Sequence, residues 1–341
     1  MKAVVDNKIP FIQGQIEQLV DEVRYLPGAE IAASDVADAD ILIVRTRTRC
    51  NRQLLEGSSV RLVVTATIGY DHIDTDFLAE KHIRWTNCPG CNAGSVRQYV
   101  HNALLATEPL FGLLPHADFA PTAAVVGVGH VGSLVADDLR RMGFRVLLND
   151  PKLPHAASLE QIAREADLIT FHPNLTTAPP HPSFHLADEA FFAQLKRWPL
   201  IINSSRGEVV SNPALLAALE SGQVRGAVVD TWENEPNIDR QLLQRAAIAT
   251  PHIAGYSADG KANATRMSLQ AVCQFLGCPF SLTITPPPLP EGFAYGPETA
   301  GPLRLYDPRV DSDRLKAHPE QFEQLRGNYP LRREIDEAEK G

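Results

Sequence analysis

The stretch Ala124-Val125-Val126-Gly127-Val128-Gly129-His130-Val131-Gly132 is followed by a helical segment and then by Arg145-Val146-Leu147-Leu148-Asn149-Asp150. It predicts a strand, a glycine-rich turn, a helix, and a second strand that ends at an acid. Gly127 permits a tight turn, Gly129 lets a pyrophosphate approach the backbone, and Gly132 lets the helix lie close to the strand. Glycines in this context are typical of a dinucleotide-binding fold, because the phosphates bind at the N-terminus of the helix.

Asp150 indicates which dinucleotide binds. It ends the second strand, 23 positions after Gly127. A carboxylate there accepts hydrogen bonds from the ribose hydroxyls and repels a 2′-phosphate. The sequence therefore predicts NAD rather than NADP, with His130 and Val131 of the glycine turn as further cofactor contacts.

From residue 123 onward, short apolar runs alternate with helical segments. Six runs are predicted to be strands: 123–126, 145–149, 168–171, 200–203, 226–230 and 247–250. Parallel strands joined by right-handed crossovers form a doubly wound (Rossmann) α/β sheet. We expect this NAD-binding domain to span residues 96–255.

The N-terminal part predicts a second, smaller α/β unit. Its apolar or β-branched runs, separated by helical segments, lie at 2–6, 40–44, 62–66 and 83–86. Residues 256–277 predict one long helix that returns to this unit. We expect residues 1–95 and 256–280 to form a flavodoxin-like substrate domain, and residues 281–341, with their proline run, to form a separate C-terminal segment.

Composition excludes several classes of protein. The chain has 341 residues, of which 44% are hydrophobic and 21% charged, and its formal net charge is −9. These values are typical of a soluble globular protein, and the acidic balance disfavours nucleic acids and anionic membranes as partners. The sequence indicates neither a secretory signal nor a membrane-spanning stretch, so we expect a cytoplasmic enzyme.

The five cysteines do not form a metal-binding pattern. Cys88 and Cys91 have the spacing of a redox pair, but they lack the preceding strand and the opening helix of a thioredoxin motif. We predict two buried thiols beside a turn, and no metal site.

Polar residues follow three successive strands of the predicted NAD domain, at the edge where open α/β sheets bind ligands. They include Arg206, the pair Glu233 and Glu235, and His252. An arginine, a glutamate and a histidine placed in this way suit the oxidation of a 2-hydroxy acid by hydride transfer. His252 would accept the hydroxyl proton, a glutamate would stabilise the imidazolium, and Arg206 would bind the substrate carboxylate. Spacing alone does not separate Glu233 from Glu235.

A second polar cluster follows two strands of the N-terminal unit. Arginines alternate with threonines over residues 45–49, and a polar segment follows at 65–72. In an extended chain Arg45, Arg47 and Arg49 would share one side and could bind a phosphate or a carboxylate. A solvated basic edge is the alternative interpretation.

Four motifs together resemble the D-isomer-specific 2-hydroxyacid dehydrogenase family: GVGHVG, SSRGEVV, VVDTWENEP and ATPHIAGYS. Further motifs are similar to those family members that oxidise 4-phospho-D-erythronate with NAD in pyridoxal 5′-phosphate (vitamin B6) biosynthesis: VDNKIP, LIVRTRT, CPGCNAGSV and YDPRVDSDRL. The narrower resemblance implies that the product is 2-oxo-3-hydroxy-4-phosphobutanoate. A family member acting on 3-phosphoglycerate, glyoxylate or hydroxypyruvate, and a non-catalytic NAD(H)-sensing protein, are the alternatives.

The resemblance also implies roles for single residues. The catalytic residues would be Arg206, Glu235 and His252, which selects Glu235 over Glu233. Substrate contacts would come from Thr46, Thr67 and Tyr256, beside Arg45 of the basic cluster. The further cofactor contacts would be Asp150, Ser204, Ser205, Asp230 and Gly255.

The resemblance implies a homodimer held by the C-terminal segment, which is shorter here than in most relatives. Two positions depart from the family pattern. Pro173 replaces a threonine that contacts the cofactor, and Gln98 stands where relatives often carry an acid.

Overall fold

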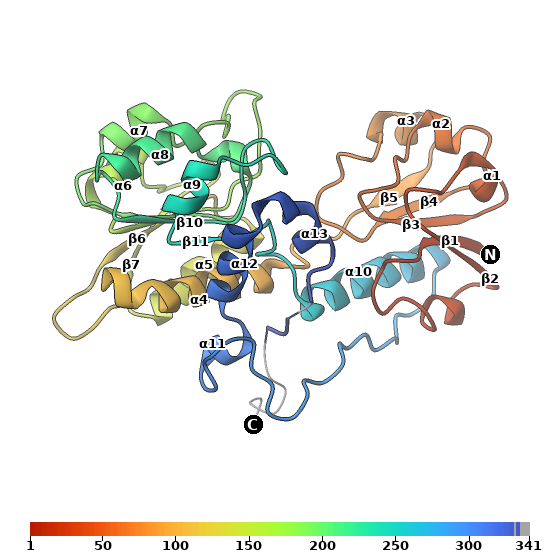
Figure 1. Cartoon of the computed structure of the whole chain (residues 1–341). Coiled ribbons are helices and arrows are strands. Elements are labelled where there is room, and N and C mark those ends of the chain that lie inside the picture. Colours follow the sequence, from red (N-terminus) through yellow and green to blue (C-terminus); the bar gives the residue numbers. More distant parts are fainter. Residues whose placement is uncertain (331, 335–341) are drawn as a thin grey trace. The chain divides into compact units, whose positions relative to one another are not determined.

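A computed structural model describes residues 1–330 and 332–334. The chain forms two compact units (Figure 1). Unit 1 comprises Met1–Asn92 and Ser257–Pro288, and unit 2 comprises Ala93–Tyr256 and the chain from Leu289 onward. The functional roles of the units, and dimerisation through residues 281–341, stay predictions. Residue 331 and residues 335–341 of that segment lie outside the described residues.

Unit 2 is built on a six-stranded parallel sheet. Its strands are β6 (Thr122–Val126), β7 (Arg145–Asn149), β8 (Leu168–Phe171), β9 (Leu200–Asn203), β10 (Gly226–Val229) and β11 (Ile248–Ala249). Their order is β11-β10-β9-β8-β6-β7, so the direction of winding reverses between β6 and β8. Rossmann sheets bind ligands at such a switch point. The predicted doubly wound sheet is confirmed.

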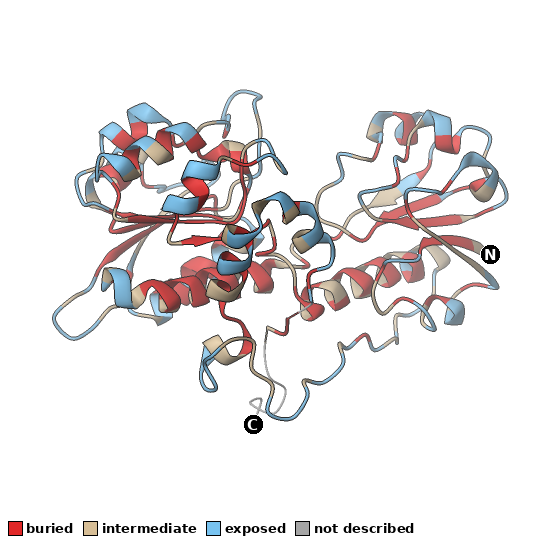
Figure 2. Cartoon of the chain, viewed as in Figure 1, coloured by how far each residue is buried: buried red, intermediate tan, exposed pale blue. Residues whose placement is uncertain are grey.

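Helices cover both faces of this sheet (Figure 1). One face carries α4 (Ala93–Phe111) and α5 (His130–Arg141); the other carries α6 (Leu159–Glu165), α7 (Glu189–Ala193), α8 (Asn212–Glu220) and α9 (Arg240–Arg245). Along β6, Ala123 and Val125 join the core under α4 and α5, whereas Ala124 and Val126 join the opposite core. Because successive side chains point to opposite faces, a strand buried on both sides is apolar throughout, as the buried strands of Figure 2 show.

Unit 1 contains a five-stranded parallel sheet. Its strands are β1 (Lys2–Asp6), β2 (Glu22–Leu26), β3 (Ile41–Val44), β4 (Leu62–Thr65) and β5 (Arg84–Thr86), in the order β2-β1-β3-β4-β5. This is the flavodoxin-like order, as predicted. β2 was not predicted from the sequence. Among the described residues it pairs only with β1, and it carries the charged residues Glu22 and Arg24. A half-exposed edge strand does not need a continuous apolar run.

Helices also cover both faces of the sheet in unit 1. α1 (Ala33–Val36), α2 (Arg52–Leu55) and α3 (Thr75–Glu80) lie on one face, and α10 (Ala258–Leu276) lies on the other (Figure 1). The hydroxyl of Ser257 caps α10 by accepting from the Gly260 N–H, and Gly277 ends the helix with a φ of 72°. The long helix predicted over 256–277 is therefore confirmed.

The described C-terminal residues of unit 2 form no core of their own. It contains α11 (Pro302–Leu305), α12 (Pro308–Ala317) and α13 (Phe322–Gly327). Leu315 and Phe322 pack into the core under α6 to α9, whereas Tyr306 and Tyr329 pack into the core under α4 and α5. We call Leu289–Glu334 the C-terminal tail; its apolar side chains complete the two cores of unit 2.

Cys88 and Cys91 are buried free thiols, as predicted. Burial raises the pKa of Cys88 to about 11 and that of Cys91 to about 12. Since the thiolate is the reactive form, these cysteines are chemically inert near neutral pH. Among the described helices, none has the length and apolar character needed to cross a membrane.

Candidate active site

The glycine turn after β6 has the geometry that its sequence predicts. Gly127 has a φ of +84°, and a Cβ there would lie 2.5 Å from the Pro173 nitrogen. A Cβ on Gly132 would overlap the Gly127 carbonyl oxygen. Gly127 therefore permits the turn, and Gly132 permits the close approach of α5.

The third glycine borders open space. Apart from Gly129 itself and its two chain neighbours, no described residue has an atom within 4 Å of the position that a Cβ on Gly129 would take. α5 begins at His130, so its N-terminal N–H groups face this space. Asp150 Oδ2 accepts a hydrogen bond of 2.9 Å from the Val128 N–H, which places the carboxylate beside the turn. The arrangement fits a dinucleotide whose pyrophosphate lies at the helix N-terminus and whose ribose lies near Asp150.

Three buried polar atoms at the carboxyl edge of this sheet have no partner within the described residues. They are His172 Nδ1, Ser204 Oγ and Thr231 Oγ1, which follow β8, β9 and β10. Burial lowers the pKa of His172 to about 3, so the ring is neutral. Because an unpaired buried polar atom is costly, these groups indicate hydrogen-bonding positions for a ligand. Of these three residues, only Ser204 was predicted to contact the cofactor, although the other two also directly follow predicted strands.

His252 and Glu235 form a hydrogen-bonded pair at the ends of β11 and β10. His252 Nδ1 lies 2.8 Å from Glu235 Oε2 and 3.1 Å from Oε1. Glu235 Oε1 also accepts the Trp232 N–H at 2.9 Å. Arg326 of α13, a residue that the sequence analysis missed, places Nη1 3.6 Å from Glu235 Oε2.

The charge of Glu235 determines which nitrogen of His252 carries the proton. Burial opposes its ionisation, but His252, the Trp232 N–H and Arg326 outweigh it, so the pKa of Glu235 is below its ordinary value. An ionised carboxylate only accepts hydrogen bonds, so His252 Nδ1 donates. In the neutral ring Nε2 is then an acceptor, as a general base requires.

Glu233 has different partners. Its Oε1 lies 2.6 Å from His185 Nε2, and its Oε2 accepts the Asn212 N–H at 2.7 Å. The structure therefore pairs His252 with Glu235 and not with Glu233, which instead joins the strand-end loop to α8 and to His185.

Arg206 follows β9 and has an exposed side chain. Its Nη1 donates to the Ser205 carbonyl at 2.8 Å. The next residue, Gly207, lies directly against the backbone of Trp232 and Glu233, where a Cβ would overlap the Trp232 carbonyl group. The loop that carries Arg206 therefore contacts the loop that carries Glu235.

Asp230 is fully buried behind His252. Its carboxylate accepts from the Thr250 hydroxyl at 2.6 Å, the Ile253 N–H at 2.8 Å and the Ala254 N–H at 3.0 Å. Burial raises the pKa of Asp230, although His252 and these hydrogen bonds act in the opposite direction. The geometry gives Asp230 a role in holding the segment that also contains Gly255 and Tyr256.

Ser205, a predicted cofactor contact, directs its hydroxyl to a neighbouring side chain. The hydroxyl donates to Asn203 Oδ1 at 2.9 Å.

In unit 1 the basic cluster is not extended, and that expectation is wrong. β3 ends at Val44, and the Thr48 N–H donates to the Arg45 carbonyl across a turn. Arg45 Nε lies 3.2 Å from the buried carboxylate of Asp6, whereas Thr46 and Arg47 are exposed. The Thr48 hydroxyl bonds the Gly28 carbonyl, which fixes the turn and explains why alternation does not continue past the strand.

Thr67 follows β4, the strand adjacent to β3. Its hydroxyl lies 2.7 Å from Thr65 Oγ1 and donates to the Gly69 carbonyl at 2.9 Å. The predicted substrate residues of unit 1 therefore lie at the carboxyl ends of two neighbouring strands.

The low pKa of Glu235 predicts a specific dependence of stability on pH. Since folding lowers this pKa from 4.5, the ionised carboxylate stabilises the fold above pH 4.5, and this contribution is lost as the pH falls through the folded value. We expect Glu235→Gln to make the free energy of unfolding less sensitive to pH below 4.5. Urea unfolding measured from neutral pH to strongly acidic pH tests this, and an unchanged slope would contradict it.

A family model for "D-isomer specific 2-hydroxyacid dehydrogenase, NAD binding domain" matches residues 116–254. The chain is 52% identical to the erythronate-4-phosphate dehydrogenase of Bacteroides fragilis, over 98% of this chain and 97% of that protein. It is 50% identical to the enzyme of the same name from Bacteroides thetaiotaomicron, again over 98% and 97%.

Solved structures show the same fold. The NAD-complexed D-isomer specific 2-hydroxyacid dehydrogenase of Lactobacillus delbrueckii ssp. bulgaricus superimposes with a TM-score of 0.67 at 20% identity, covering 82% of this chain and 98% of that chain. A D-lactate dehydrogenase from Aquifex aeolicus gives a TM-score of 0.62 at 22% identity, covering 81% and 96%.

Proposed function

The chain belongs to the D-isomer-specific 2-hydroxyacid dehydrogenase family, and we propose that it oxidises 4-phospho-D-erythronate with NAD, in pyridoxal 5′-phosphate biosynthesis. The observation that carries the proposal is its 52% identity, over nearly the whole length of both chains, to the erythronate-4-phosphate dehydrogenase of B. fragilis. The product is 2-oxo-3-hydroxy-4-phosphobutanoate.

We assign the proton transfer to His252. The neutral imidazole takes the C2 hydroxyl proton on Nε2 as the hydride leaves C2, and the resulting imidazolium is stabilised by the Glu235 carboxylate at Nδ1. Bound NAD supplies the hydride acceptor. The open space at Gly129 and the partnerless polar atoms after β8, β9 and β10 support its binding to unit 2.

We assign the substrate carboxylate to Arg206. Its guanidinium can donate two parallel hydrogen bonds to a carboxylate, which fixes the orientation of C2 as well as the charge. The exposed side chain and the contact of its loop with the Glu235 loop support this assignment.

The direct test measures NADH formation by the purified protein with 4-phospho-D-erythronate, 3-phosphoglycerate, glycerate and D-lactate, each with NAD and with NADP. Selective turnover of 4-phosphoerythronate with NAD supports the proposal. Preference for another hydroxy acid would keep the chemistry and change the substrate. Binding of NADH without any turnover would favour a sensing protein.

Replacement of Arg47 tests whether the basic cluster of unit 1 binds the substrate phosphate. It is exposed, whereas Arg45 pairs with buried Asp6, so that Arg45→Ala would also leave a buried carboxylate unpaired. If Arg47 binds the phosphate, Arg47→Ala raises KM for 4-phosphoerythronate by about 10- to 100-fold and hardly affects unphosphorylated substrates.

The matched control is Arg52→Ala, which removes an exposed arginine of the same unit that pairs with Glu56 and Glu80. We expect it to leave both KM values unchanged. Equal losses for phosphorylated and unphosphorylated substrates in Arg47→Ala would remove the phosphate assignment. The homodimer stays a prediction from the resemblance, and the cytoplasmic location stays a prediction from the sequence.

A further inference from the structure

Among the described residues of the C-terminal tail, Arg332 is the most deeply buried cation, with 2% of its surface exposed. Every guanidinium nitrogen of Arg332 has a hydrogen-bonding partner. Nε donates to Gln98 Oε1 at 3.0 Å, and Nη2 donates to the Ser95 carbonyl at 3.3 Å. The side-chain amide of Gln98 then donates to the Arg333 carbonyl at 2.8 Å, which the acid common in relatives could not do.

Three further hydrogen bonds of Arg332 go to the segment that follows His252. Nη1 donates to the carbonyls of Ile253 at 3.1 Å and Tyr256 at 2.6 Å, and Nη2 donates to the Ala254 carbonyl at 2.7 Å. Asp230 accepts two N–H groups of the same segment, from Ile253 and Ala254. The Asp230 carboxylate therefore binds N–H groups of this short loop, and the Arg332 guanidinium binds its carbonyl groups.

This loop needs such support because His252 has an unfavourable backbone conformation. Its φ is 56°, in the left-handed region that residues other than glycine seldom occupy. A residue keeps this conformation only where its surroundings enforce it. The His252 N–H donates to the Asp230 carbonyl at 2.8 Å, and the three carbonyl contacts of Arg332 restrain the residues that follow.

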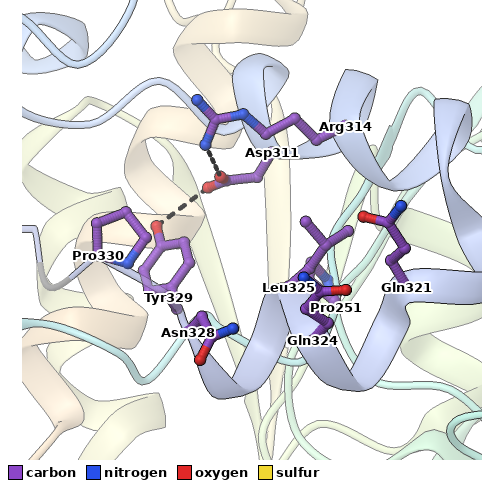
Figure 3. Close-up of a pocket in the computed structure, with 9 residues that line it drawn as sticks. All are labelled: Pro251, Asp311, Arg314, Gln321, Gln324, Leu325, Asn328, Tyr329 and Pro330. Atoms are coloured by element: carbon purple, nitrogen blue, oxygen red, sulfur yellow. Dashed lines mark hydrogen bonds and ion pairs between the residues drawn. The ribbon is translucent and has the colours of Figure 1, made fainter.

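The buried charge of Arg332 is compensated within the tail. Its guanidinium carbon lies 3.9 Å from the centre of the Tyr306 ring. Nη1 also donates to the Tyr329 hydroxyl at 3.3 Å, and that hydroxyl donates to Asp311 Oδ2 at 3.0 Å. Figure 3 shows Tyr329 and Asp311 pointing toward each other, and the pocket that they line is also lined by Pro251, the residue before His252. The network therefore links α12 to the loop of His252.

We propose that Arg332 is a positioning residue for the reaction, which holds the His252–Tyr256 loop so that the imidazole remains aligned between Glu235 and the substrate. This inference rests on the proposed function. If it is correct, the C-terminal tail contributes to the active site, because Arg332 binds a loop that lies more than 70 positions earlier in the sequence.

The test compares Arg332→Lys with Arg309→Lys in the full chain. Lysine keeps the positive charge but loses the planar set of donors. Arg309 is a tail arginine that pairs with Asp307 and Glu298, so its replacement controls for general loosening of the tail. We expect Arg332→Lys to lower kcat for 4-phosphoerythronate by roughly 10- to 100-fold, more than it changes KM, and Arg309→Lys to lower it less than about twofold.

Hydrogen exchange of the Ile253 and Ala254 amides is the second readout. A positioning role predicts faster exchange there in Arg332→Lys, with little change in the strands of unit 2. Should Arg332→Lys fail to fold, Tyr329→Phe provides the milder variant, since it removes the hydroxyl between Arg332 and Asp311. It should show the same two effects at smaller amplitude.

Folded Arg332→Lys with wild-type kcat and wild-type exchange in the loop would overturn the proposal, as would Tyr329→Phe with neither effect where Arg332→Lys does not fold. Absence of turnover in the wild-type protein would instead overturn the proposed function. The exchange measurement would still decide whether Arg332 holds the loop.

Discussion

Replacing His252 with alanine is expected to lower kcat by about 10³-fold and to leave NADH binding unchanged. The imidazole is the only side chain proposed to take the substrate proton, and general-base catalysis contributes up to about 10⁴-fold in rate. The substitution leaves unchanged the glycine turn, Asp150 and the polar atoms after β8 to β10 that have no partner among the described residues. Initial rates and titration of NADH fluorescence measure the two effects.

Backbone strain needs a separate control in this experiment, because His252 has a φ of 56°. Asparagine adopts the left-handed region more readily than alanine, so His252→Asn removes the base with less strain. Equal losses in the two variants would show that the base is what matters.

A second histidine–glutamate pair, His185 and Glu233, provides a control for the pair of His252 and Glu235. His185 also has a positive φ, of 48°, and also contacts a glutamate, Glu233, at 2.6 Å. We expect His185→Asn to retain turnover within a few-fold. Activity that survives in His252→Ala but is lost in His185→Asn would contradict the choice of Glu235 and His252.

Most of the fold could be predicted from the sequence because strands buried on both faces are apolar throughout. The runs that become β6, β8 and β9 are buried along their whole length, and their sequences predict buried strands. β2 carries no such signal, since it lies at a sheet edge and takes its stability from pairing with β1. The turn at Arg45–Thr48 was missed because it depends on a tertiary hydrogen bond to Gly28.

The site also contains features that the sequence could predict and features that it could not. The rule that ligands bind beyond strand ends identified Arg206, His252 and the two glutamates, because it needs only strand positions. It could not rank Glu233 and Glu235, which are two residues apart on one loop. The two glutamates differ in their partners elsewhere in the chain. Glu233 contacts His185 and Asn212, whereas Glu235 contacts His252.

Arg326 and Arg332 could not be found from local patterns. The tail has too little apolar periodicity to predict where it packs, and its arginines resemble ordinary surface cations in sequence. The packing of tail side chains such as Leu315, Phe322 and Tyr329 into the cores of unit 2 brings Arg326 to Glu235 and Arg332 to the His252 loop.

The second large effect is expected from Gly207→Ala, which adds one methyl group beside Arg206. A Cβ at this position would overlap the Trp232 carbonyl group and lie 2.5 Å from the Glu233 nitrogen. These are backbone atoms, so no side-chain rotation relieves the clash, and the loops after β9 and β10 must separate. We expect the free energy of unfolding to fall by about 3 kcal/mol.

We also expect kcat of the folded fraction to fall by about 10²-fold in Gly207→Ala, since separation of the loops moves Arg206 away from Glu235 and His252. Urea unfolding and initial rates, both taken where the variant is folded, measure the two losses. Gly222→Ala is the control: its φ is +73°, but no described residue other than its two chain neighbours has an atom within 4 Å of the added Cβ. It should cost about 1–2 kcal/mol through the backbone alone and preserve kcat. Wild-type kcat in folded Gly207→Ala would mean that the two loops can separate without disturbing the reacting groups, and the contact between them would then have no part in aligning Arg206.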